Sequence, residues 1–508
     1  MMKTIKKGDI DRLIWGHRLY DEQTGIMTLL EFLSVLESKT FAQHNPNREI
    51  SSETLKLGDY KIPKRTVLRT LVFNNPYIDE IYTSREDPWE RWFNCFSADD
   101  QNAKFDSNGS YKAVELKEKL QNLFGDRSDR SGRKSFDNFA RIIRLLRFSG
   151  INVMSDKRWT SRFIFPWGKN CLFGDLRQNG TTDRRFFGRN GELLFLLLSF
   201  AQRRDELERL IRERILESNH PLDRLCEALQ IDNEVIQIPG GALLPEFFNV
   251  EDFKRVDILC EDLIHLFELP IPTPDVVNFA SRIIQLNLLC FFMECSFKVL
   301  QSCGTEMPFE KNIYICEVIQ KTSTDLRRIS KEIFVRNNKQ SADAVRAYYE
   351  RELGEQRGTD DEEFELQLME GESMEGKADT LEQVLSTHSE HWGKIHRAFS
   401  KDCGLSSRLC TNAFRYAPMD ELLEALAAAI VTSKRLLLSQ FLAQVYERYG
   451  LIFGEAEFKR AGVSVPDLVA DSSEFKKNRR RLQGRFEALG LLVTLSDGFE
   501  FVLNPYRS

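Results

Sequence analysis

The chain has 508 residues, which is more than one hydrophobic core usually holds, so we expect roughly two to four domains. Its apolar fraction of 42% and charged fraction of 29% are typical of a soluble globular protein, and its net charge of −6 argues against a general nucleic-acid binder. The longest apolar stretches, 193–201 and 283–295, are shorter than the ~20 residues of a membrane span. We therefore expect buried helices and no membrane partner.

The N-terminus and the cysteines indicate a cytoplasmic protein. A signal peptide has an apolar stretch after its positively charged start, and no such stretch follows the lysines of residues 1–7. The ten cysteines include no Cys-x-x-Cys pair and no zinc spacing, and most lie in apolar runs. In the absence of a signal sequence, such cysteines are typical of a reducing compartment.

The N-terminal part, residues 1–56, is predicted to be a helical segment. Its apolar residues recur at helical spacing over 9–38, on both sides of a turn at 23–25, and a polar loop follows. Residues 57–190 are predicted to be α+β. Within them 67–73 fits a helix or a strand, and Asn74, Asn75 and Pro76 form a turn signal.

The segment 135–166 predicts a helix followed by a hairpin. Ser135 is placed to cap a helix over 136–148, and Gly150 ends it. An apolar run at 151–154, a polar turn and a β-like run at 159–165 follow, and Pro166 closes the segment.

Charge is distributed unevenly over the rest of the chain. Segment 127–190 has fifteen Lys/Arg and five Asp, a net charge of +10, whereas 350–382 has thirteen Asp/Glu and three Lys/Arg, a net charge of −10. Such asymmetry indicates a polyanion site and a solvated acidic linker. Between them, 191–349 has helical periodicity and is predicted to be an α-helical middle domain, and 383–432 a helical connector.

The last segment, 433–508, shows the most specific pattern of the chain. A helix is predicted over 434–449, and Asp471 and Glu474 stand three apart, as in a capping box. A helix over 474–489 follows, with Gly490 at its C-cap. The apolar runs 491–495 and 499–503 are then joined through Asp497 and Gly498, a strong hairpin signal.

A basic helix that leads into a β-hairpin resembles the winged-helix superfamily, over about residues 433–507. The helix–glycine–hairpin order at 135–166 repeats the pattern, so a second, more divergent winged helix is predicted near 57–167; a helix with an ordinary hairpin is the alternative. The fold class expected is thus a mainly α, multi-domain protein. Winged helices mostly bind DNA, and many instead dock proteins, so the resemblance implies either role.

Two groups of cations are candidate nucleic-acid ligands. Guanidinium groups bind phosphates through paired hydrogen bonds, and flat rings stack on unpaired bases. The alternative is a core of rings rimmed by solvated arginines. In the basic segment, where cations alternate with aromatic residues, the candidates are Arg158, Arg162, Lys169, Arg184, Arg185 and Arg189. On the C-terminal helix they are Lys476, Lys477, Arg479, Arg480, Arg481 and Arg485.

We expect no metal, cofactor or catalytic centre. His388, His391 and His396 do not converge on one face of a helix. Residues 371–378 match the phosphate-loop spacing except for Ala378, which lacks the Mg²⁺-binding hydroxyl, and their surroundings are acidic. We therefore reject nucleotide binding there.

A metal-dependent nuclease is the one enzyme class that the sequence leaves open. It would need an acid-x-Lys element with a second carboxylate. Asp59 and Lys61 have that local form, and Asp79 or Glu80 could supply the partner.

The expected function is that of a non-enzymatic DNA-binding or scaffold subunit of a cytoplasmic multi-protein complex. Its expected partners are nucleic acid, with DNA as the expected type, and other protein subunits. Bacterial phage defence and DNA maintenance use such subunits, although no residue points to either. A second hypothesis is an architectural linker resembling kleisins, which dock a C-terminal winged helix on a chromosome-organising ATPase. The acidic segment and the terminal module fit it, and the long helical domain fits it less well.

Overall fold

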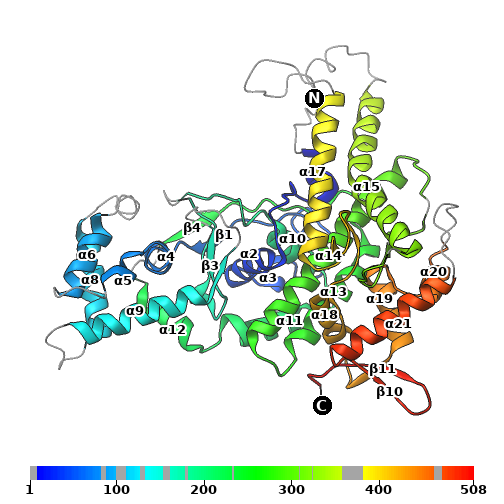
Figure 1. The fold of residues 1–508 in the computed structure, drawn as a ribbon. Helices are drawn as coiled ribbons and strands as arrows, with labels where there is room; N and C mark the ends of the chain where they lie inside the picture. Colours follow the sequence, from blue (N-terminus) through cyan, green and yellow to red (C-terminus); the bar gives the residue numbers. More distant parts are fainter. Residues whose placement is uncertain are drawn as a thin grey trace.

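The structure, a computed structural model, describes residues 9–81, 87–98, 110–125, 132–152, 161–177, 181–230, 234–307, 309–322, 324–356, 381–462 and 472–507. It is mainly helical, which confirms the predicted class. Figure 1 shows a larger body around α14 (Thr273–Ser302) and a smaller lobe at the left that contains α9 (Arg133–Phe148).

Helix α14 is the centre of the larger body. It begins after Pro272, with Pro274 in its first turn, and its end is closed by Gly304, whose φ of +75° suits glycine. Among the described helices it alone is long and apolar enough to cross a membrane. Of the 18-residue stretch that meets this criterion, 89% is buried inside the fold. The expectation of buried helices is confirmed for α14 and for α10 (Asn190–Leu198).

The N-terminal helices pack directly on this centre. Thr24 caps α2 (Gly25–Ser38) by accepting a hydrogen bond from the Met27 amide, at 3.4 Å. A side chain at Gly25 would lie 2.1 Å from the Ser281 carbonyl oxygen, so glycine is what lets α2 approach α14. The Trp15 indole of α1 (Asp9–Trp15) donates to the Phe292 carbonyl at 3.1 Å. The two helices predicted around residues 23–25 are therefore confirmed.

The rest of the body is a set of helices with short strand pairs. Strands β1 and β4 pair antiparallel, and α15 and α17 lie side by side (Figure 1). The elements are α3 (Phe41–His44), β1 (Tyr60–Pro63), η2 (Lys169–Cys171), α11 (Arg204–Ile211), the π-helix η3 (Arg212–Leu216), α12 (Pro221–Leu229), β4 (Val235–Ile238), η4 (Val250–Asp252), α13 (Phe253–Phe267), β5 (Tyr314–Ile315), α15 (Asp325–Gln356), α17 (Leu381–Asp402), β6 (Ser406–Ser407) and β7 (Arg415–Tyr416).

The smaller lobe has an aromatic core. Trp89 packs against Trp92, Phe136 and Phe139 with ring centroids 5.2–6.1 Å apart, and its indole donates to the Ser135 hydroxyl at 2.9 Å. Helix α9 leads into an antiparallel hairpin, as predicted. The lobe contains α4 (Thr66–Phe73), α5 (Tyr77–Glu80), α6 (Pro88–Ala98), α8 (Ser110–Phe124), α9, β2 (Gly150–Asn152) and β3 (Arg162–Ile164).

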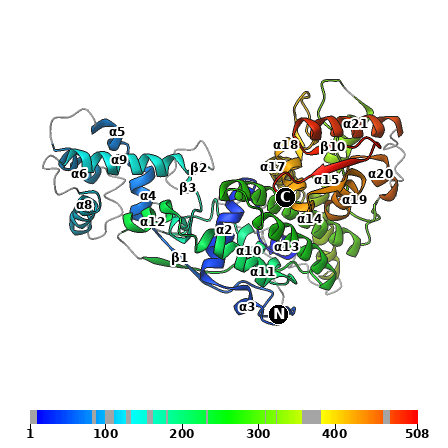
Figure 2. The ribbon, with the colours of Figure 1, turned by 90° about the horizontal axis from the view of Figure 1, so that it is seen from below.

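The C-terminal part has a mixed topology. A helix is followed by a strand, further helices and a hairpin, and the three-stranded sheet has the order β10-β11-β8. Figure 2 shows α21 lying over this sheet, close to α20. The elements are α18 (Asp420–Ile430), β8 (Arg435–Leu437), α19 (Leu438–Tyr449), β9 (Leu451–Ile452), α20 (Glu455–Arg460), α21 (Ser472–Ala488), β10 (Leu492–Thr494) and β11 (Glu500–Leu503).

Several predicted boundaries change. The helix expected over 434–449 begins at Leu438, because Arg435–Leu437 pairs with β11 as a strand. Helix α9 begins at Arg133, so Ser135 lies inside it and donates to the Gly132 carbonyl instead of capping it. Helix α15 continues to Gln356, into the expected acidic linker. The phosphate-loop-like residues 371–378 and the capping residue Asp471 lie outside the described residues.

Candidate nucleic-acid interface

Helix α21 is anchored by one face. Its buried residues, Phe475, Asn478, Leu482 and Phe486, recur at helical spacing, and Phe486 meets Phe441 of α19 edge to face at 5.8 Å. The helix ends at Gly490, whose φ of +70° is the predicted left-handed C-cap. Because one face is fixed in the core, the opposite face is turned outward.

Asn478 fastens α21 to the helical body. Its side-chain oxygen accepts from the Val318 amide at 2.8 Å, and its side-chain nitrogen donates to the carbonyls of Cys316 and Phe453 at 3.0 and 2.9 Å. All four hydrogen-bonding positions of a buried amide must find partners, and three are occupied here by backbone. The sequence analysis missed this residue, since an asparagine within a basic helix has no local signal of burial.

The outward face of α21 carries cations. Lys476 and Arg480 are exposed and form no ion pair with another described residue. Lys477 is also exposed, with its ammonium 2.8 Å from the Glu474 carboxylate. We call Lys476, Lys477 and Arg480 the α21 face.

The other three predicted cations of α21 turn toward the protein. Arg479 is 3.1 Å from the Glu500 carboxylate of β11, and Arg485 pairs with Asp420 at the start of α18. Arg481 is half-buried. Arg479 and Arg485 thus link the helix to neighbouring elements and are less available to an external ligand than the cations of the α21 face.

The basic segment 127–190 divides into two groups. Arg158 lies outside the described residues, and Arg162 on β3 and Lys169 in η2 are exposed. Arg184, Arg185 and Arg189, in contrast, are engaged within the fold. Arg185 is 2.9 Å from Glu22, and the other two share the buried Glu192.

Glu192 is the centre of a buried ion network. One of its oxygens is 2.6 Å from Arg184, and the other is 3.1 Å from Arg189 and accepts from the Gly241 amide at 2.9 Å. Burial alone would raise the pKa of Glu192, but the two guanidinium groups lower the pKa below its ordinary value. Burial and the charge of Glu192 raise the pKa of neighbouring Glu31 to about 8. The network joins α2, α10 and the loop before Ala242, so its role is structural.

Four phenylalanines of the same segment form a buried cluster. The ring of Phe163 stacks on Phe173 and Phe187, with centroids 5.2 and 5.1 Å apart, and meets Phe186 edge to face. All four rings are buried. For residues 184–189 the alternation of rings and cations therefore follows from a packed core with ion pairs around it.

Among the described residues no group of three His, Cys, Asp or Glu is placed to hold a metal ion. Asp59 accepts from Gln237 and the Gly240 amide, whereas Asp79 pairs with Arg144 and Arg147, so the two carboxylates have different partners.

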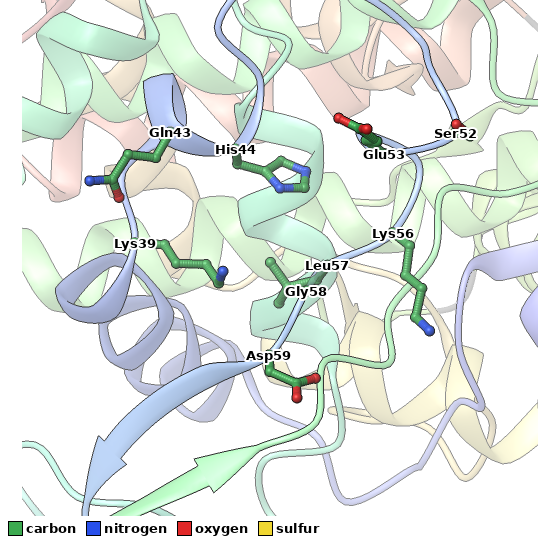
Figure 3. Close-up of a pocket in the computed structure, with 9 residues that line it drawn as sticks. All are labelled: Lys39, Gln43, His44, Ser52, Glu53, Lys56, Leu57, Gly58 and Asp59. Atoms are coloured by element: carbon green, nitrogen blue, oxygen red, sulfur yellow. The ribbon is translucent and has the colours of Figure 1, made fainter.

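An open pocket of about 470 Å³ lies beside Asp59 (Figure 3). Its charged side chains are Lys39, Lys56, Glu53 and Asp59, with His44 pointing toward its centre. Because cations and carboxylates are balanced, the pocket does not select a ligand by charge.

Comparison with known proteins adds no homologue. No protein-family model, curated protein or solved structure matches the chain.

Proposed function

We propose that the chain is a DNA-binding subunit without catalytic activity of its own, whose C-terminal winged helix presents the α21 face to the phosphate backbone. The observation that carries the proposal is the topology of the last 90 or so residues. The order α18, β8, α19, α21, β10, β11 resembles that of a winged helix, with β9 and α20 as additional elements between α19 and α21. The sheet order β10-β11-β8 supports the resemblance, because in a winged helix the first strand joins the hairpin at its second strand. In a winged helix of this order, α21 would be the recognition helix.

The charges on α21 support contact with a polyanion. The helix has six Lys/Arg against two Glu in Ser472–Ala488, although the whole chain is net negative. Three cations that are exposed on one face can each displace a counterion from DNA, which makes binding dependent on salt. The chain would act as one subunit of a cytoplasmic multi-protein complex, and chemistry on the DNA would belong to the other subunits.

The proposal extends to the smaller lobe. The order of α8, α9 and the hairpin β2–β3 resembles the second half of a winged helix, and α9 exposes Arg141 while β3 exposes Arg162. Two such modules at different places on the chain would allow contacts with two parts of one DNA. This lobe contributes less to the proposal, because Arg144 and Arg147 are held by Asp79.

A salt titration tests the proposal. The affinity for a fluorescent duplex is measured at several salt concentrations for the wild type and for Lys476→Ala/Lys477→Ala/Arg480→Ala. Loss of three phosphate contacts should weaken binding and reduce the slope of log K against log salt by roughly 2 to 3.

The matched control removes three exposed cations of α15, as Lys331→Ala/Lys339→Ala/Arg346→Ala. It changes the net charge equally and should leave the slope nearly unchanged. If the two triple variants bind alike, or if the wild type does not bind DNA, the α21 face is not a nucleic-acid interface.

A further inference from the structure

The sheet of the C-terminal module has two different faces. Val493 is paired with Phe501, and Phe501 with Leu437, so these three side chains share one face. The neighbouring residue Glu500 lies on the other face, where it meets Arg479 of α21 at 3.1 Å. The inner face is therefore covered by α21, and the outer face carries the half-buried Val493, Leu437 and Phe501.

Aromatic and cationic groups gather on this outer face. Phe499 lies two residues before Phe501 along the chain and is 56% exposed. The Arg435 guanidinium carbon lies 4.6 Å from the centroid of the Phe501 ring. Arg435 is exposed and forms no ion pair with another described residue. The ring beside Arg435 is thus the half-buried Phe501, whereas the exposed ring is Phe499. Exposed rings and guanidinium groups together can bind unpaired nucleic acid, because every base has a flat face on which a ring can stack.

The exposed ring is held on a rigid turn. The Leu495 amide donates to the Phe499 carbonyl and the Gly498 amide to the Leu495 carbonyl, each at 2.9 Å. The Asp497 carboxylate accepts from the Phe499 amide at 3.2 Å, and Gly498 has a φ of +82°. A fixed turn presents the ring without the entropy cost of ordering a loop on binding.

Charge alone does not explain a contact between this hairpin and DNA. Residues 491–504 contain no Lys or Arg and include Asp497 and Glu500. In contrast to α21, the hairpin cannot bind phosphates by ion pairs, so its ring is the group with which it could hold nucleic acid. Arg435, which pairs with Leu503 across the sheet, is an exposed cation of the same sheet that could meet the phosphate of a stacked nucleotide.

We infer that the outer face of β10-β11-β8 binds an unpaired strand by stacking a base on Phe499, with Arg435 beside its phosphate, so that the module prefers duplex DNA with a single-stranded extension to blunt duplex. The inference rests on the proposed function, since α21 would hold the duplex. It adds that the ligand is a junction between paired and unpaired DNA.

The test compares a blunt duplex with the same duplex carrying a short single-stranded extension of either polarity. The first unpaired base is 2-aminopurine, whose fluorescence falls when it stacks on an aromatic ring. The wild type should bind one extended duplex roughly tenfold more tightly than the blunt duplex, the order of magnitude of one stacked base. Binding should quench the fluorescence.

Three variants test whether the ring of Phe499 is responsible for the preference and the quenching. Phe499→Ala should remove the preference and the quenching, while its affinity for blunt duplex and its salt slope stay those of the wild type. Phe499→Trp should keep both. Phe148→Ala, which removes a ring that is 92% exposed at the end of α9, is the matched control and should behave as the wild type.

The outcomes separate the two claims. If the wild type binds blunt and extended duplexes equally, or if Phe499→Ala keeps the preference, the inference is wrong while the proposed function stands, and a protein partner becomes the better explanation for the exposed ring. If the wild type binds neither duplex, the proposed function and the inference both fail.

Discussion

Replacement of Asn478 by alanine should show how strongly α21 depends on the helical body. The change removes three hydrogen bonds at once and leaves the Val318 amide and the carbonyls of Cys316 and Phe453 without the partner that Asn478 provides. The side chain is fully buried, so water does not readily replace it. Each buried backbone group that loses its partner costs about 1–3 kcal/mol, so the loss of three partners should lower the free energy of unfolding by about 3 kcal/mol or more.

Urea unfolding followed by circular dichroism measures this loss, and Gln483→Ala is the matched control. Gln483 lies on the same helix, but its side chain makes one bond to Glu500 at a half-buried position, so its removal should cost about 1 kcal/mol or less. DNA affinity should fall with Asn478→Ala, because the α21 face is no longer held in place. An Asn478→Ala protein as stable as the Gln483→Ala protein would refute the reasoning.

Three further predictions concern buried charge, pH and the hairpin. Glu192→Ala leaves Arg184 and Arg189 without their shared carboxylate and should lower the free energy of unfolding in urea by about 3–5 kcal/mol. The control Glu206→Ala removes a surface ion pair with Arg203 and should lower it by about 1 kcal/mol or less. Burial lowers the pKa of His396 to about 3, so only the unfolded chain takes up the proton below its ordinary pKa of 6.5 and stability falls as the pH drops. From about pH 7 to about pH 5 this one histidine should account for about 2 kcal/mol, and His396→Gln should lose that part of the pH dependence; an unchanged pH dependence would show that the histidine is protonated in the fold. Gly498→Ala places a side chain on a residue with a φ of +82° and should lower the free energy of unfolding by about 1–2 kcal/mol. The loss should appear as a lower midpoint of urea unfolding, and an unchanged midpoint would mean that the turn adapts.

Much of the C-terminal module could be predicted from its sequence. Asp497 and Gly498 between two apolar runs specify a hairpin by local chemistry, and Gly490 marks the end of α21 in the same way. Strand β8 could not be predicted, because Arg435–Leu437 continues directly into α19 and becomes a strand only by pairing with β11. The position of Arg435 beside Phe501 depends on that pairing and was missed with it.

The basic segment shows the opposite limit. Local spacing of arginines and aromatic residues indicated a nucleic-acid surface at 184–189. Their partners Glu31 and Glu22 are more than 150 positions away in sequence, as the hydrogen bonds from Arg184 and Arg185 show. A pattern within a short stretch of sequence does not reveal whether an arginine pairs with a carboxylate that is distant in sequence. On α21 the sequence does show which side chains are buried and which are exposed, because helical spacing separates the buried Phe475 and Leu482 from the exposed Lys476 and Arg480.

The most direct test of the central claim uses the unmodified sequence. Lysine acetylation with mass spectrometry compares the reactivity of each lysine in the free protein and with duplex DNA at low salt. We predict that Lys476 and Lys477 become protected, while Lys339 of α15 and Lys394 of α17, both exposed, react as before. Binding of the duplex with Lys476 and Lys477 as reactive as in the free protein would contradict the account.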